Sequence, residues 1–241
     1  MNVQIKKQKA LDFFLTRLLE TEVGRSIAKV VLFGSLLKDK AKEDSDIDLL
    51  VITTDSVKKV SLACAETSFE TAMATGESVE PLIRCIDEVR HPQSYFIYSA
   101  FNRGREIYSM NEKELKRKEA QNYLDLAAEY LDGSIANLQR SCFRIAVDAA
   151  YNGCELAVKG MLLLKLPDIP SSHGGIVNKF GLLFVKTEDV PKEIGRNLHL
   201  ALEMRNNARY EPHAQITKDQ ADLIINLAKQ LQALLEKQIE T

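Results

Sequence analysis

Two near-continuous apolar runs, at residues 27–33 and 47–53, constrain the fold of this chain more than any other feature. Each run has the length of a β-strand but lacks the alternation of apolar and polar residues that marks a strand with one face in water. We therefore predict two strands that are covered on both faces. Apolar residues recur at helical spacing over residues 3–23 and 57–74, which predicts two amphipathic helices in the same region.

The remainder of the N-terminal region predicts a third strand and short flanking elements. Residues 78–86 form an apolar segment interrupted by Pro81. Because proline cannot donate a hydrogen bond to a sheet ladder, Pro81 predicts that this strand lies at a sheet edge or carries a bulge. A short helix is expected at residues 93–102 and an extended segment at residues 104–108.

The pattern changes after residues 109–111, and almost everything that follows is helical in character. Helices are predicted at residues 113–137, 140–166, 176–183, 191–210 and 217–240. The second of these is expected to turn Ile145, Ala149, Leu156, Met161 and Leu164 inward. Thr217 and Gln220 have the spacing of a capping box, which predicts the start of the last helix.

The predicted fold class is therefore α+β. We expect an α/β domain with a small mixed sheet at residues 1–110 and an all-α helical bundle at residues 111–241.

Composition narrows the classes of protein that this chain can belong to. The formal net charge of −2 gives no indication of a generic basic surface for nucleic acid, although a local basic groove is compatible with it. The four cysteines form no C-x-x-C pair, which favours free buried thiols: Cys64, Cys85, Cys142 and Cys154. The N-terminus does not resemble a signal peptide, and no apolar run approaches the roughly 20 residues that span a bilayer. We expect a cytoplasmic protein.

The segment between the first two strands contains the residue types of a phosphate and metal site. Gly34 and Ser35 end the first strand, and a glycine there allows backbone N–H groups to approach a phosphate. Asp46 and Asp48 open the second strand, where alternation points both carboxylates to one side. Mg²⁺ prefers one or two carboxylates together with substrate phosphates. The alternative is a solvated acidic turn, but acids that abut an apolar strand favour nucleotidyl transfer.

The same segment resembles the nucleotidyltransferase superfamily that includes DNA polymerase β, and in particular its minimal nucleotidyltransferase branch. That branch carries Gly-Ser, ten residues and then Asp-x-Asp, as Gly34-Ser35 and Asp46-Ile47-Asp48 do here. The resemblance implies that Asp46 and Asp48 hold two Mg²⁺ ions, with Glu80 as the third catalytic carboxylate and metal ligand. It also implies that Gly34, Ser35 and Ser45 contact the nucleotide. The alternative for Glu80 is an exposed glutamate of an edge strand.

What the resemblance implies is transfer of an NMP, with ATP as the expected donor, to a hydroxyl acceptor, with release of pyrophosphate. The acceptor stays open between a protein tyrosine, a small molecule and RNA.

Residues 113–240 resemble HEPN domains, the helical nucleotide-binding bundles of higher eukaryotes and prokaryotes. The resemblance is carried by AVDAAYNGCELAVKGMLL, SSHGGIV, RNNARY and ITKDQADLIINLAKQL. Active HEPN ribonucleases carry Arg, four to six residues and then His. Here Arg205-Asn206 keeps the start, Tyr210 stands at the nearest histidine position, and seven residues separate Arg205 from His213. His173 is expected in a loop, either touching a nucleotide or as a plain surface histidine.

Three functions therefore stay open. The first is a nucleotidyltransferase whose helical half shapes the acceptor site and forms a homodimer. The second is an RNA-binding or ribonuclease toxin module of the HEPN type, regulated by its fused nucleotidyltransferase as in toxin–antitoxin pairs. The third is a nucleotide-binding pseudoenzyme, which the intact set of Asp46, Asp48 and Glu80 disfavours.

Overall fold

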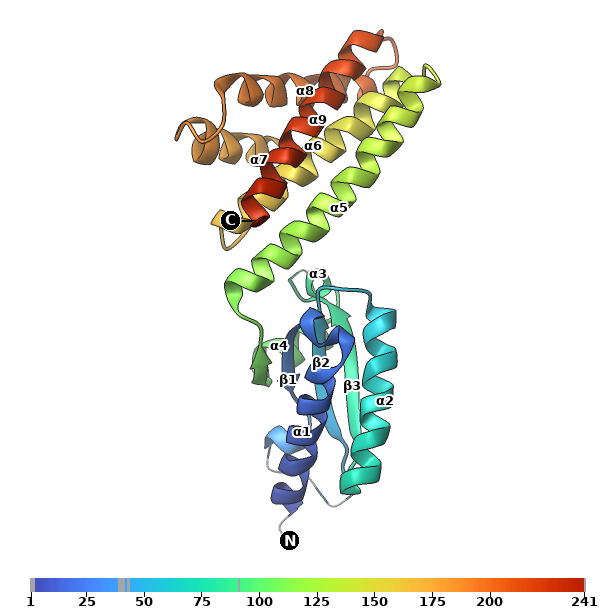
Figure 1. Ribbon diagram of the computed structural model, residues 1–241, viewed down its shortest axis with the longest axis vertical. Coiled ribbons are helices and arrows are strands. Elements are labelled where there is room, and N and C mark those ends of the chain that lie inside the picture. Colours follow the sequence, from blue (N-terminus) through green and yellow to red (C-terminus); the bar gives the residue numbers. More distant parts are fainter. Residues whose placement is uncertain (1–2, 39–41, 43, 91, 241) are drawn as a thin grey trace. The chain divides into compact units, whose positions relative to one another are not determined.

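The computed structural model describes residues 3–38, 42, 44–90 and 92–240 of the chain. The chain divides into two compact units, at residues 1–115 and 116–241, and each is described by itself (Figure 1). None of the helices in the described ranges combines the length and the apolar character needed to cross a membrane.

The N-terminal unit is built on a four-stranded mixed sheet with the order β3-β2-β1-β4. The strands are β1 (Ile27–Leu32), β2 (Ile47–Thr53), β3 (Val79–Cys85) and β4 (Arg105–Ser109). β1 is antiparallel to both β2 and β4, whereas β2 and β3 are parallel. The parallel pair requires a crossover, which α2 (Val57–Thr75) supplies. The prediction of a small mixed sheet is confirmed, and β3 lies at an edge as Pro81 predicts.

Side chains from β1 and β2 are buried on both faces of the sheet, as their apolar runs predict. One face packs against α1 (Val3–Glu20) and α2, and the other against α3 (Ile86–Arg90) and α4 (Tyr95–Arg103) (Figure 1). The first face buries Ile27, Val30, Leu32, Ile47, Leu49, Val51, Val79 and Ile83. The second buries Ala28, Val31, Leu50 and Ile52. Each large aliphatic side chain buried in this way contributes about 1.5–3 kcal/mol. Short 3-10 turns, η1 (Glu22–Ser26) and η2 (Leu36–Lys38), complete the unit.

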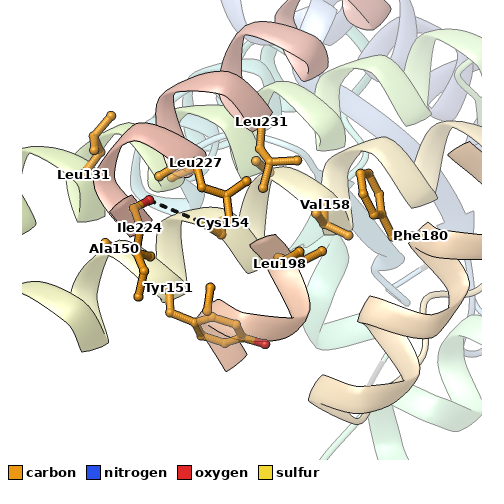
Figure 2. Close-up of a cluster of buried hydrophobic side chains, with 14 of the residues drawn as sticks. Leu131, Ala150, Tyr151, Cys154, Val158, Phe180, Leu198, Ile224, Leu227 and Leu231 are labelled. Carbon is orange, nitrogen blue, oxygen red and sulfur yellow. Dashed lines mark hydrogen bonds between the residues drawn. The ribbon is translucent and has the colours of Figure 1, made fainter. Parts of the chain in front are cut away.

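The C-terminal unit is a bundle around α6 (Phe143–Lys165). The other helices are α5 (Glu112–Gln139), α7 (His173–Phe180), α8 (Lys192–Tyr210) and α9 (Lys218–Glu240), with a π-helical turn η3 (Gly181–Val185) after α7. α6 lies against α7, α8 and α9, and Figure 2 shows Cys154 and Val158 of α6 among leucines of the neighbouring helices. Gly160 permits this packing, because a Cβ there would lie 2.6 Å from Leu235 Cδ2.

Two local contacts define the ends of the last two helices. The predicted capping box is confirmed: the Thr217 N–H donates to Gln220 Oε1 at 2.9 Å, and the Gln220 N–H donates to Thr217 Oγ1 at 3.3 Å. At the end of α8, the Arg144 guanidinium of α6 donates to backbone carbonyls. Its acceptors are the carbonyl oxygens of Asn207, Ala208, Glu211, Pro212 and Ala214.

Two details differ from the sequence expectation. Ile145 is 56% exposed, so its predicted inward position is wrong; the buried face of α6 begins at Ala146 and Val147 instead. The four cysteines are free, as predicted, but only Cys64 and Cys154 are buried, whereas Cys142 is exposed. Burial raises the pKa of the Cys64 thiol to about 12, which makes this thiol unreactive at neutral pH.

Candidate functional site

The end of β1 and the start of β2 meet at Gly34 and Asp48. The Phe33 N–H donates to the Asp48 carbonyl at 3.1 Å, which continues the antiparallel ladder to the last residue before Gly34. Gly34 has a φ of 80°, and a Cβ at this position would lie 1.9 Å from Asp48 Oδ2. Only glycine accepts both the left-handed backbone and the close approach of the carboxylate. The turn after β1 and the carboxylate of β2 are therefore built against each other.

The pKa of the Asp48 carboxyl reflects its position beside a second carboxylate, Asp46. Burial raises the pKa of the Asp48 carboxyl above its usual value, repulsion from Asp46 raises it further, and a hydrogen bond from the Ser35 N–H opposes both. Two neighbouring carboxylates that repel each other are stabilised by a cation between them. Their oxygen ligands suit Mg²⁺, so this part of the site fits the ion.

Glu80 lies directly across from Asp48 on the parallel neighbour β3, where the two residues are register partners. Register partners in a sheet direct their side chains to the same face, with neighbouring strands about 4.8 Å apart. Glu80 is exposed, however, and among the described residues no three His, Cys, Asp or Glu side chains are gathered closely enough to hold a metal ion. The backbone thus brings Glu80 next to Asp46 and Asp48. The Glu80 carboxylate, however, does not converge with the other two carboxylates on one metal position.

Ser45 takes part in the turn that leads into β2. Its hydroxyl accepts from the Lys42 N–H at 2.9 Å, and its own N–H donates to the Lys42 carbonyl at 3.2 Å. These bonds fix the chain immediately before Asp46.

Lys7 of α1 is a residue of this site that the sequence reasoning missed. Its side chain is buried, and its Nζ donates to the Ser45 carbonyl at 2.5 Å and to Glu77 Oε2 at 2.7 Å. Ser45 directly precedes Asp46, and Glu77 lies three residues before Glu80. One ammonium group therefore joins the two segments that introduce the acidic strands. The available signal was its place on the apolar stripe of the helix, with Ala10, Leu11, Phe14 and Leu18.

In the C-terminal unit, Arg205 of α8 is 97% buried and lies between two tyrosines. Its guanidinium carbon is 5.8 Å from the Tyr151 ring centroid and 5.7 Å from that of Tyr210. Arg205 Nη1 donates to Asn206 Oδ1 at 3.2 Å, and Nε lies 3.5 Å from Asp148 Oδ1. Tyr210 is exposed at the end of α8, and His213 lies in the exposed segment that follows. Of the four residues predicted here, Arg205, Asn206 and Tyr210 are in contact.

The Tyr151 hydroxyl lies against a buried carboxylate, Glu155, which has three partners. His173 Nδ1 is hydrogen-bonded to a Glu155 oxygen, the Tyr151 hydroxyl donates to Glu155 Oε2 at 3.2 Å, and Lys159 Nζ lies 2.9 Å from Oε1. Burial raises the pKa of the Glu155 carboxyl, but the hydrogen bonds from His173 and Lys159 outweigh it and hold the pKa below its usual value.

The position of His173 differs from the expectation of a loop residue. It is the first residue of α7, whose cap is Ser172, and the centroids of the His173 and Tyr151 rings are 6.1 Å apart. Glu155 and Tyr151 were missed by sequence reasoning, although their spacing of four residues places both on one face of α6.

Comparison with known proteins divides the chain in the same order. The polymerase β nucleotidyltransferase family model matches residues 15–113, and the HEPN domain model matches residues 120–238. A proposed toxin of Methanocaldococcus jannaschii is 25% identical over 110 residues, which span 46% of this chain and 74% of that protein.

One solved structure, the spectinomycin adenyltransferase AAD(9) from Enterococcus faecialis with ATP and spectinomycin, matches over 95% of this chain and 99% of its own. It is 13% identical, with a TM-score of 0.33, and at that TM-score the likeness carries no argument.

Proposed function

Because this chain joins a polymerase β-type nucleotidyltransferase domain to a HEPN domain, we propose that it transfers an NMP, from ATP, to a hydroxyl acceptor in an Mg²⁺-dependent reaction. The observation that carries the proposal is the contact between Gly34 and Asp48. It sets a phosphate-binding turn against an acidic pair, and Gly34 does not tolerate replacement by a residue with a Cβ at that distance.

The roles follow from this arrangement. The turn at Gly34 and Ser35 would face the triphosphate with its Gly34 N–H, because the Ser35 N–H already donates to Asp48, while Asp46 and Asp48 would hold the metal. When bound, Mg²⁺ would offset the charge of the phosphates and of the attacking and leaving oxygens. Glu80, opposite Asp48, has an exposed side chain that is able to rotate toward the pair, where it would accept the proton of the acceptor hydroxyl. The acceptor oxygen bonds to the α-phosphorus, the bond from that phosphorus to the bridging oxygen breaks, and pyrophosphate leaves.

The proposal also includes the acceptor substrate and the oligomeric state. The acceptor is a protein tyrosine, a small molecule or RNA, and the protein acts in the cytoplasm as a homodimer through its helical unit. Support for the dimer comes from Leu126 and Tyr130, which are exposed one turn apart on α5.

The first prediction concerns the metal. Wild-type protein incubated with labelled ATP and Mg²⁺ should release pyrophosphate, and excess EDTA should reduce release to background because Asp46 and Asp48 then repel the triphosphate. Added Mg²⁺ should restore the rate. Binding of a non-hydrolysable ATP analogue, measured by calorimetry with and without Mg²⁺, serves as the control when no acceptor is present. Equal binding with and without the metal would contradict the proposal.

A second candidate function, RNA binding or cleavage by the HEPN domain, is favoured by one observation. Among the buried side-chain atoms in the described part of the chain, Arg205 Nε and Asp148 Oδ1 make no hydrogen bond, although the two lie 3.5 Å apart as an ion pair. A buried guanidinium that is incompletely bonded is costly unless it serves an anion. Tyr151 also contacts His173 and Glu155, so the cluster combines a cation suited to phosphate with a proton-transfer group.

This candidate predicts that Arg205→Lys lowers RNA binding or cleavage at least about tenfold, because lysine keeps the charge but loses the planar fork. The matched control is Arg196→Lys, at an exposed position on the same helix. The readouts are filter binding and gel analysis of a labelled RNA. Wild-type protein that neither binds nor cleaves RNA would exclude this second function.

A further inference from the structure

A cavity of about 590 Å³ lies on the face of β3 that carries Glu80. Glu80, Leu82 and Arg84 share this face because strand side chains alternate. Leu82 and Arg84 line the cavity, at about 7 Å and about 13 Å along the strand from Glu80. The remaining lining comes from α3, α4 and the segment between them. Those residues are Asp87, Glu88, Gln93, Ser94, Phe96 and Ile97.

One wall of the cavity is in contact with the phosphate-binding turn. Phe96 of α4 packs edge-on against Phe33, with ring centroids 5.6 Å apart and planes at 82°. Phe33 directly precedes Gly34, so the cavity wall, the turn and the acidic strands form one connected surface within the N-terminal unit. A ligand that begins at Gly34 and Asp48 therefore has the cavity within reach on the same face of the sheet.

The lining is suited to a flat, uncharged group that carries hydrogen-bond donors. Phe96 is 54% exposed, and its ring is the large aromatic surface of the cavity. Arg84 is already occupied, since Nε lies 3.3 Å from Glu88 Oε2 and Nη1 donates to the Ile83 carbonyl at 2.7 Å. Asp87 adds a second carboxylate. Two carboxylates against one paired guanidinium repel phosphate and accept hydrogen bonds from amino groups.

We propose that this cavity holds the base of the donor nucleoside triphosphate, with the base stacked on Phe96. This inference rests on the proposed function. We further propose that the cavity selects bases with an exocyclic amino group over uracil. Adenine, guanine and cytosine present an exocyclic amino group to Asp87, whereas uracil lacks one, and its single N3–H lies between two carbonyl oxygens that the carboxylates repel. The site thereby sets a base preference that Gly34, Asp46 and Asp48 do not provide.

The test measures nucleotide binding without turnover. Calorimetry of the full chain with Mg²⁺ and non-hydrolysable analogues of ATP and UTP should show ATP binding at least about tenfold more tightly. Phe96→Ala should weaken ATP binding about tenfold, within the range measured for loss of base stacking, and Phe96→Tyr should retain it. Asp87→Asn should narrow the difference between ATP and UTP, since an amide also donates. Phe69→Ala, at an exposed aromatic position on α2, is the matched control and should change neither affinity.

Two outcomes would overturn the proposal. Unchanged ATP affinity in Phe96→Ala, combined with a raised KM for the acceptor, would assign the cavity to the acceptor instead. Equal affinity for ATP and UTP in the wild type would remove the base preference. Failure of the proposed function is seen separately: analogues that bind as described while ATP gives no pyrophosphate would leave the cavity assignment standing and remove the transfer reaction.

Discussion

Replacing Asp48 with asparagine should lower the rate of pyrophosphate release at least about a hundredfold while leaving the N-terminal unit folded. Asparagine has the shape of aspartate and keeps an oxygen for the Ser35 N–H, so the close contact with Gly34 is retained. What is lost is the negative charge that would hold the metal. The site would then keep its geometry but lose the charge that faces the triphosphate.

The measurement is pyrophosphate release at saturating ATP, with circular dichroism to verify folding. Asp44→Asn is the matched control, because Asp44 is an exposed carboxylate in the same turn and should leave the rate unchanged. Asp46→Asn should match Asp48→Asn, and Glu80→Gln should have a smaller effect because its side chain is exposed and outside the pair. An Asp48→Asn protein with the wild-type rate would refute the assignment of the acidic pair.

Lys7→Met should destabilise the N-terminal unit by about 3–5 kcal/mol, the effect expected when one partner of a buried ion pair is removed. The Glu77 side chain is only 12% exposed, and the Ser45 carbonyl relies on the same ammonium. Methionine fills a similar volume, so the effect would come from charge and hydrogen bonding. The rate of pyrophosphate release should also fall, because the segments before Asp46 and Glu80 lose their common contact.

Urea unfolding followed by circular dichroism measures this effect, with Lys9→Met, at an exposed position on the same helix, as the control. The double variant Lys7→Met with Glu77→Leu should recover much of the stability, since apolar replacement of both partners removes the unpaired charge. If the double variant recovers stability but not the rate, Lys7 positions the acidic strands as well as stabilising them. Lys7→Met with wild-type stability would show that the buried pair contributes little.

The local parts of the fold and the site were predictable because they depend on neighbouring residues. Both ends of β2 were predicted correctly from its apolar run. The Gly-Ser and Asp-x-Asp pairs also lie at the strand ends, as their spacing predicted. Pro81 marked the edge strand through its missing N–H. By contrast, the end of α1 depends on the 3-10 turn at Glu22–Ser26, for which the apolar pattern carried no signal.

Contacts between residues far apart in the sequence could not be predicted from local patterns. The Lys7 contacts with Ser45 and Glu77 join positions 38 and 70 residues apart, and no periodic pattern encodes such a pair. The same holds for His173 and Glu155, which meet only because α7 folds back on α6. Ile145 was placed inward from its spacing alone, but its side chain in the first turn of α6 is 56% exposed.

The Arg144 contacts at the end of α8 have a consequence for ligand affinity. The Arg144 side chain of α6 donates hydrogen bonds to carbonyls at and just after the end of α8. A positive charge at this end of the helix also interacts favourably with the helix dipole. Asp148 and Tyr151, one and two turns further along α6, therefore keep a constant spacing from Arg205 on α8. If the proposed RNA function holds, an anion bound at Arg205 would meet a preorganised frame, and little of its binding energy would be spent on ordering the helices.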